Sequence, residues 1–260
     1  MTPIALSIAG SDCSAGAGLQ ADLKTFQHFQ TYGLTAATCV VAETPKIVLS
    51  VHPVPPTIVQ DQVALLLKSY PIAAIKTGML FSKAHVVAIS ELLAKHPDIP
   101  LVVDPVMVAS TGDSLLKRDA IEAYRERLLP LATLITPNLD EAEVLLDRPI
   151  RDEATIETAA TELSKRFGTA VLLKGGHLEA PECADLLCEG GKLTWFRSPR
   201  IDTTASHGTG CTLSAAIAAR LAHADDLATA IDRAKTYLSQ SLSEALQLGE
   251  IPHLNQGTTF

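Results

Sequence analysis

Short apolar runs alternate with longer helix-like stretches along most of this 260-residue chain. A short run that is apolar throughout fits a strand buried on both faces, and a longer stretch with helical spacing fits the helix that crosses to the next strand. The predicted strands are residues 4–9, 36–41, 73–76, 101–103, 134–135 and 171–173. The predicted helices are residues 19–29, 56–69, 83–95, 118–129, 156–167, 212–221 and 226–248. The alternation predicts an α/β fold, a three-layer sandwich with a mostly parallel central sheet and helices on both faces.

Composition narrows the class of protein. With 47% hydrophobic and 19% charged residues, and with no linker or internal repeat, residues 1–260 are expected to form a single domain. A net charge of -8 argues against sequence-independent binding of nucleic acid. No apolar run reaches the roughly 18 residues needed to cross a membrane. Five cysteines without a CxxC pair fit a reducing compartment, so the expected location is the cytoplasm.

Nearly every predicted strand runs directly into a cluster of small, polar or acidic residues. The clusters are AGSD (9–12), TGM (77–79), DPVM (104–107), TPN (136–138) and KGGH (174–177). Any one of them fits an ordinary turn, because loops after strands are rich in Gly, Pro, Asp and Asn. The carboxyl ends of parallel strands meet at one edge of the sheet, where ligands bind in open α/β folds. The five clusters together therefore predict a composite active site.

The loop after the first strand, residues 10–18, is rich in glycine and serine and leads into a helix. It is not a Walker A loop, because no Gly-Lys-Ser/Thr follows. Gly16, Gly18 and Ala21 nearly fit the dinucleotide fingerprint, with Glu43 as the candidate ribose-binding acid. A dinucleotide site, a flexible turn and a loop that approaches another anion or a polar ring all stay open for this segment.

Two carboxylates, Glu141 and Asp104, follow later predicted strands. Asn138 and Glu141 open a helix after Pro137, a spacing that fits a capping box. The same pair presents an amide and a carboxylate on one side of the helix, which suits a phosphate with hydrated Mg²⁺. Asp104, before Pro105, is either a turn residue or a carboxylate that binds Mg²⁺ or a substrate hydroxyl.

Residues 207–212, HGTGCT, precede an alanine-rich helix. Their glycines leave backbone N–H groups free to form an anion hole at the helix N-terminus. The positive end of the helix is expected to lower the pKa of Cys211 and make it a base or a hydrogen-bond partner. The alternative is a small cysteine packed in a tight turn. His177 and His207 lack a third ligand at metal-site spacing, and His207 is expected to order the anion loop.

The chain from about residue 4 to about residue 240 closely resembles the hydroxymethylpyrimidine/phosphomethylpyrimidine kinases of thiamine biosynthesis. The resemblance rests on AGSDCSAGAGLQADLKTF, KTGML, VVDPVMVASTGDSLL, ITPNLDEAEVLL, LLKGGH and SHGTGCTLSAAIAA, in this order. It implies a ribokinase-like fold, a homodimer, and transfer of the γ-phosphoryl of Mg-ATP. The implied acceptor is the hydroxymethyl group of 4-amino-5-hydroxymethyl-2-methylpyrimidine, which then receives a second phosphoryl group.

The resemblance also implies roles for individual residues. The implied anion hole and reaction centre are Gly208, Thr209, Gly210 and Cys211, with Cys211 as base towards the substrate hydroxyl. The implied nucleotide contacts are Asn138, Lys174, Asp104 and Thr209, and Glu141 is the implied Mg²⁺ ligand. The implied pyrimidine pocket is formed by Gly10, Asp22, Glu43, Met79 and Val106.

Glu43 departs from the family pattern. Where the family has Ala-Gln-Asn-Thr, this chain has Ala42-Glu43-Thr44-Pro45. The usual Gln donates to a ring nitrogen and accepts from the 4-amino group, whereas an ionised Glu only accepts. Either the ring nitrogen or Glu43 carries a proton, the substrate differs, or Glu43 turns away and water reads the ring.

Two other functions are compatible with these motifs. A pyridoxal or pyridoxine kinase is the alternative within the same reaction class, because related small kinases phosphorylate that hydroxymethyl ring. A non-catalytic pyrimidine-binding protein on the same fold is the alternative from another class, but such a protein has no use for a phosphoryl anion hole. A dehydrogenase would explain the first loop but not the loop that carries Cys211.

Overall fold

The computed structural model describes residues 2–107, 118–175 and 182–257. Within these residues the chain forms a nine-stranded sheet with the order β3-β2-β1-β4-β5-β6-β7-β8-β9. The strands are β1 (Ile4–Asp12), β2 (Tyr32–Thr44), β3 (Ile47–Pro53), β4 (Ala74–Thr77), β5 (Leu101–Val103), β6 (Leu134–Ile135), β7 (Ala170–Lys174), β8 (Glu182–Glu189) and β9 (Lys192–Pro199). Neighbours from β2 to β7 pair in parallel, and β3, β8 and β9 pair antiparallel. The prediction of a mostly parallel sheet is confirmed.

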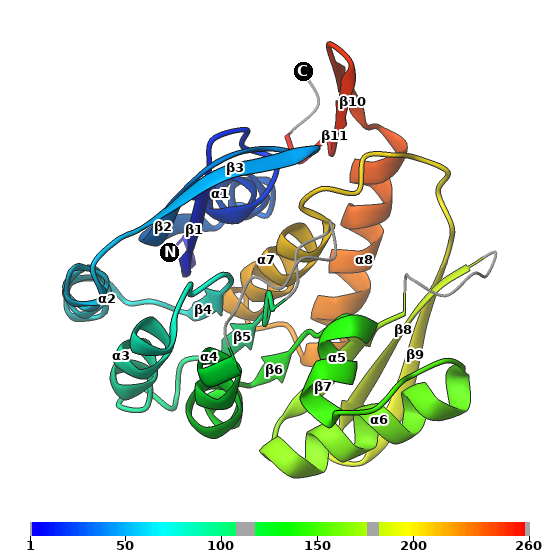
Figure 1. Cartoon of the computed structure of the whole chain (residues 1–260). Helices are drawn as coiled ribbons and strands as arrows, with labels where there is room; N and C mark the ends of the chain where they lie inside the picture. Colours follow the sequence, from blue (N-terminus) through cyan, green and yellow to red (C-terminus); the bar gives the residue numbers. More distant parts are fainter. Residues whose placement is uncertain (1, 108–117, 176–181, 258–260) are drawn as a thin grey trace.

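Helices cover both faces of this sheet (Figure 1). One layer is made of α1 (Gly18–His28), α7 (Thr209–Ala222) and α8 (Leu227–Ser243). The other is made of α2 (Pro56–Ser69), α3 (Lys83–Leu93), α4 (Arg118–Ala123), α5 (Leu139–Leu146) and α6 (Glu153–Phe167). A π-helical turn, Tyr124–Leu128, and a 3-10 turn, Leu129–Leu131, continue α4. Within the described residues, no helix has the length and hydrophobicity required to span a bilayer.

Burial of the central strands on both faces explains why their sequences are mostly apolar. Successive residues of a strand point to opposite faces, so Val102 packs against the α7 and α8 layer and Val103 against the α2 to α6 layer. Leu134 and Ile135 in β6 divide in the same way, and all four side chains are fully buried. The sandwich therefore has two hydrophobic cores, separated by the sheet.

The last predicted helix is too long. Helix α8 ends at Ser243, and the chain then forms a small hairpin of β10 (Leu246–Leu248) and β11 (Ile251–His253). Gly249 has a φ of +64° in the turn between them, a conformation that glycine adopts without strain. The prediction extended the amphipathic pattern of α8 through these residues, although the glycine marks a turn.

The order of the strands reverses beside β1. The chain runs from β1 through α1 to β2 on one side, and then crosses through α2 to β4 on the other side. In open α/β sheets a reversal of this kind leaves a crevice outside the carboxyl ends of the strands. Described residues at or just after the carboxyl ends of β1, β4, β5, β6 and β7 lie at that crevice: Gly10, Met79, Asp104, Asn138 and Lys174.

Candidate active site

A cavity of about 810 Å³ opens at the carboxyl edge of the sheet. Each of the five predicted strand-end clusters contributes at least one residue to its wall. The predicted site residues that line it are Gly10, Glu43, Met79, Asp104, Val106, Asn138, Glu141, Lys174, Gly208, Thr209, Gly210 and Cys211. Gly176 and His177 of the KGGH cluster lie outside the described residues. The cavity brings the first loop, the strand-end carboxylates and the N-terminus of α7 together.

Asp22 is the exception, and its predicted place in the pyrimidine pocket is corrected by the structure. Its side chain is fully buried beneath the cavity, where both carboxylate oxygens lie 2.9 Å from the Lys76 ammonium. The Ser7 hydroxyl donates to Asp22 Oδ2 at 2.5 Å. The first turns of α1 pack against β1, so this position faces the sheet and not the crevice. Burial opposes the charge of Lys76, but the Asp22 carboxylate raises the pKa of Lys76 and keeps the ammonium charged.

Asp12 organises the loop between β1 and α1. Its carboxylate accepts hydrogen bonds from the backbone N–H groups of Ser14, Gly16 and Ala17 at 2.7, 3.0 and 2.8 Å. It also lies 3.0 Å from His207 Nε2 in the loop before α7. Burial alone would raise the pKa of Asp12, but the bonds from His207, Ser14 and Ala17 lower it to about 2. Asp12 is therefore ionised and holds this loop in one conformation.

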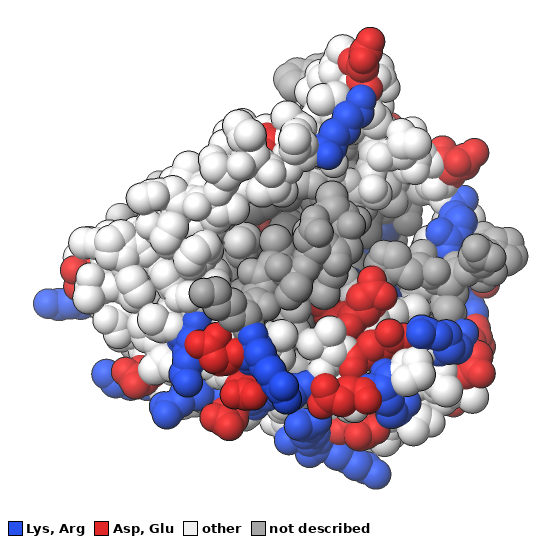
Figure 2. All heavy atoms as spheres, viewed as in Figure 1, with Lys and Arg blue, Asp and Glu red and all other residues white. Residues whose placement is uncertain are grey.

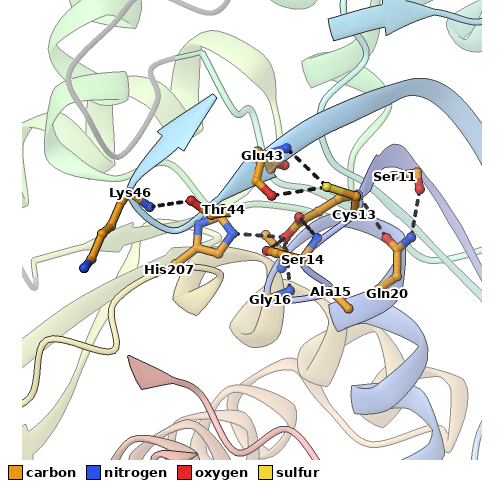
Figure 3. Close-up of polar contacts among 12 residues, drawn as sticks. Ser11, Cys13, Ser14, Ala15, Gly16, Gln20, Glu43, Thr44, Lys46 and His207 are labelled. Carbon is orange, nitrogen blue, oxygen red and sulfur yellow. Dashed lines mark hydrogen bonds and ion pairs between the residues drawn. The ribbon is translucent and has the colours of Figure 1, made fainter. Parts of the chain in front are cut away.

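The same contact joins the first loop to the loop before α7. Figure 3 shows His207 pointing towards the Ser14 to Gly16 stretch, and its bond to Asp12 is consistent with the expectation that His207 orders its loop. Gly208 has a φ of +82°, and a Cβ at this position would lie 2.0 Å from Gly16 O. No other residue could occupy position 208 without separating the two backbones.

Cys211 lies in the first turn of α7, at the meeting point of these loops. The backbone of Gly18, at the start of α1, is one of the groups that lower the pKa of its thiol. Burial raises the pKa of the Cys211 thiol to about 11, with contributions from Asp22 and Asp104, although Lys76 and the Gly18 backbone act in the opposite direction. The prediction of a lowered pKa was therefore wrong, because desolvation outweighs the field of the helix. In the free protein the thiol is protonated at neutral pH.

Asp104 and Lys174 form the centre of a buried charged cluster. Lys174 Nζ lies 3.1 Å from Asp104 Oδ1, and the Thr136 and Ser214 hydroxyls donate to the Asp104 oxygens at 3.3 Å each. A Cβ added to Gly210 would lie 3.3 Å from Lys174 Nζ. The cluster therefore lies directly against the first turn of α7.

Glu141 extends this cluster. Its carboxylate accepts from the Asn138 N–H at 2.9 Å and the Met107 N–H at 3.2 Å, and Asn138 Oδ1 accepts from the Glu141 N–H at 2.8 Å. The capping box anticipated for this helix is present, and its members also face the cavity. Burial and the charge of Asp104 raise the pKa of Glu141, while the attraction of Lys174 lowers it. The negative charges of Asp104 and Glu141 are balanced by the single ammonium of Lys174, so this cluster favours the binding of a further cation.

Magnesium fits this donor set. Mg²⁺ is usually held by one or two carboxylates together with waters and substrate phosphates, and not by a complete cage of side chains. Among the described residues, no group of three or more His, Cys, Asp or Glu side chains could hold a metal. An ion beside Asp104 and Glu141 would draw its remaining ligands from phosphate oxygens and water.

Glu43 lies on the opposite wall of the cavity, at the end of β2. Burial raises the pKa of its carboxyl group, the negative charge of Asp12 adds to the rise, and His207 opposes it. Its backbone is fixed by Cys13, whose sulfur contacts Glu43 N at 3.3 Å and Glu43 O at 3.2 Å (Figure 3). Glu43 thus lies in the cavity wall, and its pKa is shifted towards the protonated form, which could donate a hydrogen bond to a ring nitrogen.

Sequence reasoning did not single out two residues that shape the site. Asp12 was only one member of a strand-end cluster, and its five hydrogen bonds depend on a loop that folds back on it. Lys76 ends an otherwise apolar predicted strand. A lysine in such a strand is a usable signal, because an ammonium that is buried needs a carboxylate partner.

Comparisons with known proteins agree with this geometry. A family model described as phosphomethylpyrimidine kinase matches residues 12–255. The hydroxymethylpyrimidine/phosphomethylpyrimidine kinase of Rhizobium meliloti is 44% identical over 96% of this chain and 95% of its own length. The thiamine biosynthesis bifunctional protein ThiED of Geobacter sulfurreducens is 45% identical over 94% of this chain, which spans only 50% of that longer protein.

Solved structures of kinases with two different activities share this fold. The phosphomethylpyrimidine kinase of Clostridium difficile superposes with a TM-score of 0.82 at 36% identity, covering 92% of this chain and 99% of that one. The ADP complex of the Bacillus subtilis pyridoxal kinase superposes with a TM-score of 0.92 at 34% identity, covering 98% of both chains. The family match over nearly the whole chain, together with these relatives, shows that this protein belongs to the phosphomethylpyrimidine kinase family, on a ribokinase-like fold.

Proposed function

We propose that this enzyme transfers the γ-phosphoryl of Mg-ATP to the hydroxymethyl group of 4-amino-5-hydroxymethyl-2-methylpyrimidine, and then adds a second phosphoryl group to the monophosphate. Membership of the family supports the substrate class. The observation that carries the proposal is the meeting of the α7 N-terminus, Cys211 and the Asp104–Lys174 pair in one cavity. Phosphoryl transfer needs little more than positioning and stabilisation of charge, and this arrangement provides both.

Each part of the site has a distinct task in this mechanism. The N–H groups of Gly210 and Cys211, in the first turn of α7, lack carbonyl partners within the helix and would bind the oxygens of the transferring group. The Thr209 N–H donates to Ser206 O over 3.3 Å, and a phosphate oxygen would compete for this donor. Lys174 would contact the phosphates of the nucleotide. Asp104 and Glu141 would hold Mg²⁺, which neutralises phosphate charge when bound.

Cys211 would contact the substrate hydroxyl. In the free protein its thiol is protonated, so it first serves as a hydrogen-bonding and positioning group. Asp104 is one of the charges that raise the pKa of this thiol. Once that charge is balanced by the bound nucleotide complex, the thiol ionises more easily and becomes a better acceptor for the hydroxyl proton. Because the transition state is loose, a strong base is not required.

Glu43 would read the edge of the pyrimidine ring as a protonated carboxylic acid. Burial and the negative charge of Asp12 shift its pKa in the direction that favours this form. A protonated Glu can donate to a ring nitrogen through one oxygen and accept from the amino group through the other, as an amide does. This form removes the conflict between an ionised carboxylate and a neutral ring nitrogen.

A pyridoxal kinase is the second candidate, favoured by the close superposition on the Bacillus subtilis pyridoxal kinase. Steady-state kinetics with the aminopyrimidine and with pyridoxal, each with Mg-ATP, decide between the two. The proposal predicts a higher kcat/KM for the aminopyrimidine. A higher value for pyridoxal would replace it with the second candidate, and tight binding of the aminopyrimidine without turnover would identify a binding protein.

We further propose that the enzyme is a cytoplasmic homodimer, with β3 in the interface. This edge strand exposes three consecutive apolar side chains, Ile47, Val48 and Leu49, with 58, 42 and 78% of their surfaces accessible. Figure 2 supports the choice, because charged side chains gather over α3 to α6 while the surface over β2 and β3 is largely uncharged. A second copy is the partner that covers such an edge by closed symmetry.

A further inference from the structure

Gln256 lies close to the end of the chain, yet only 2% of its surface is exposed. Its side-chain amide Nε2 donates to Gly16 O and to Thr212 Oγ1, both at 2.9 Å. The backbone carbonyl oxygen of Gln256 accepts from the Tyr237 hydroxyl at 3.0 Å, which anchors this part of the chain to α8. The residues around Gln256, after the β10–β11 hairpin, are therefore fixed in place and carry one amide group into the molecule.

The two acceptors of this amide belong to the two loops that form the reaction centre. Gly16 lies in the first loop, where its backbone packs against Gly208 in the loop before α7. Thr212 follows Cys211 directly in the first turn of α7. One NH₂ group thus joins the Gly16 backbone carbonyl to the Thr212 side-chain hydroxyl, where the first loop meets α7.

We propose that Gln256 is a positioning residue for phosphoryl transfer, which holds Gly16 against Thr212 and so fixes the first loop against the first turn of α7, where Cys211 and the anion hole lie. This inference rests on the function proposed above. The residue does not touch the reacting groups and acts through the two loops. Displacements of about 1 Å at a reaction centre can lower a rate about a hundredfold, so a brace of this kind affects turnover without binding a substrate.

The chemistry of an amide suits this place. Gly16 O can only accept, and Thr212 Oγ1 accepts here, so the brace needs two hydrogens on one atom, which an amide nitrogen has. Gln256 Oε1 faces the Lys24 ammonium at 3.5 Å, and Lys24 Nζ donates to Ala15 O at 2.6 Å. The first loop is therefore bound by the terminal segment both directly and through Lys24.

Gln256→Met tests the brace, because methionine has a similar length and no donor. We expect kcat to fall about tenfold while KM for ATP and for the pyrimidine changes less than about threefold. Hydrogen exchange measured by mass spectrometry should show faster exchange in peptides covering residues 13–18, and unchanged exchange in α6. Gln256→Glu sets a carboxylate oxygen against Gly16 O, so it should also lower kcat and speed exchange in residues 13–18. This second variant tests the brace if the methionine variant folds poorly.

Thr169→Val is the matched control. Thr169 Oγ1 donates to Ala132 O at 2.6 Å in a buried place before β7, at the edge of the sheet opposite the cavity. Its loss should lower stability and leave kcat unchanged. The inference is overturned if folded Gln256→Met retains the wild-type kcat, or if residues 13–18 exchange at the wild-type rate. The exchange measurement needs no turnover, so it judges the brace even if the wild-type enzyme fails to phosphorylate the pyrimidine and the proposed function is lost.

Discussion

Cys211 illustrates how the surroundings of one side chain decide its chemistry. The N-terminus of α7 and the Lys76 ammonium both favour a thiolate, and burial together with two carboxylates favours the thiol. Desolvation is the largest of these effects, so the resting residue is protonated. Its contribution to catalysis therefore depends on what enters the cavity, which links the binding of the nucleotide complex to the reactivity of the thiol.

Replacing Cys211 separates catalysis from packing. Cys211→Ala should lower kcat at least a hundredfold, the usual loss when a group that handles the reacting proton is removed, while KM changes less than about threefold. Cys188→Ala, in the buried part of β8, is the control for the loss of a sulfur and should alter stability only. Equal changes in kcat and KM for Cys211→Ala would mean that the residue only shapes the pocket.

The protonation of Glu43 should make kcat/KM depend on pH. Its pKa is raised, and the protonated acid is the form that donates to the ring, so kcat/KM for the neutral aminopyrimidine should fall as pH rises through that pKa. Glu43→Gln keeps the donor at every pH and should raise kcat/KM on the alkaline side. pH–rate profiles of the two proteins measure this effect, and superimposable profiles would show that Glu43 does not contact the ring.

At the scale of elements, the first loop and α7 behave as one unit. Asp12 binds His207 across the interface, and Gly208 packs on the backbone of Gly16. Both contacts join residues that are far apart in the sequence. This explains why the loop motif alone was ambiguous between a dinucleotide site, a turn and an anion site: the partner that decides its shape lies in another element.

Asp12→Asn tests the strength of this unit. The lowered pKa of Asp12 means that its stabilisation is complete above the unfolded value of 3.8 and is lost as pH falls through about 2. The variant should be less stable by about 2 kcal/mol at neutral pH, because a charged acceptor is lost. Urea unfolding between pH 4 and pH 2 should show a smaller loss of stability in the variant than in the wild type. An equal loss would assign the acid sensitivity to other carboxylates.

The sequence predicted the parallel strands and most helices because each carries its own periodic pattern. Strands β5 and β6 and helix α2 have the predicted bounds. The antiparallel strands β3, β8 and β9 were missed. β3 and β9 are the edge strands and mix apolar with polar residues, and the apolar residues of β8 are interrupted by Asp185. The placement of Asp22 and the pKa of Cys211 were also mistaken, because both depend on burial by other elements, which no local pattern encodes.

At the scale of the whole molecule, the exposed edge of the sheet is the feature that the single chain leaves unexplained. Three apolar residues of β3 face solvent beside the open cavity. Pairing of two copies at this edge would protect the strand and place each interface near an active site. Oligomeric state and activity would then be linked through β2, which carries Glu43 and pairs with β3.

Leu49→Lys tests the assembly. Leu49 has 78% of its surface exposed in the single chain, so the substitution should leave the folding of each subunit unchanged. In a dimer with β3 at the interface, a charge at this position should weaken association at least tenfold. Sedimentation velocity over a range of concentrations measures the effect, with Leu65→Lys, an exposed position on α2, as the control. A wild-type protein that sediments as a monomer would contradict the prediction.

The most direct test of the central claim is the mass of the products formed from 4-amino-5-hydroxymethyl-2-methylpyrimidine and Mg-ATP. With the wild-type enzyme, mass spectrometry should detect a monophosphate first and a diphosphate later, and Cys211→Ala should form neither in the same time. Formation of ADP without a phosphorylated pyrimidine, or products that appear equally fast with Cys211→Ala, would contradict the claim that this cavity, with Cys211 at its centre, phosphorylates the pyrimidine.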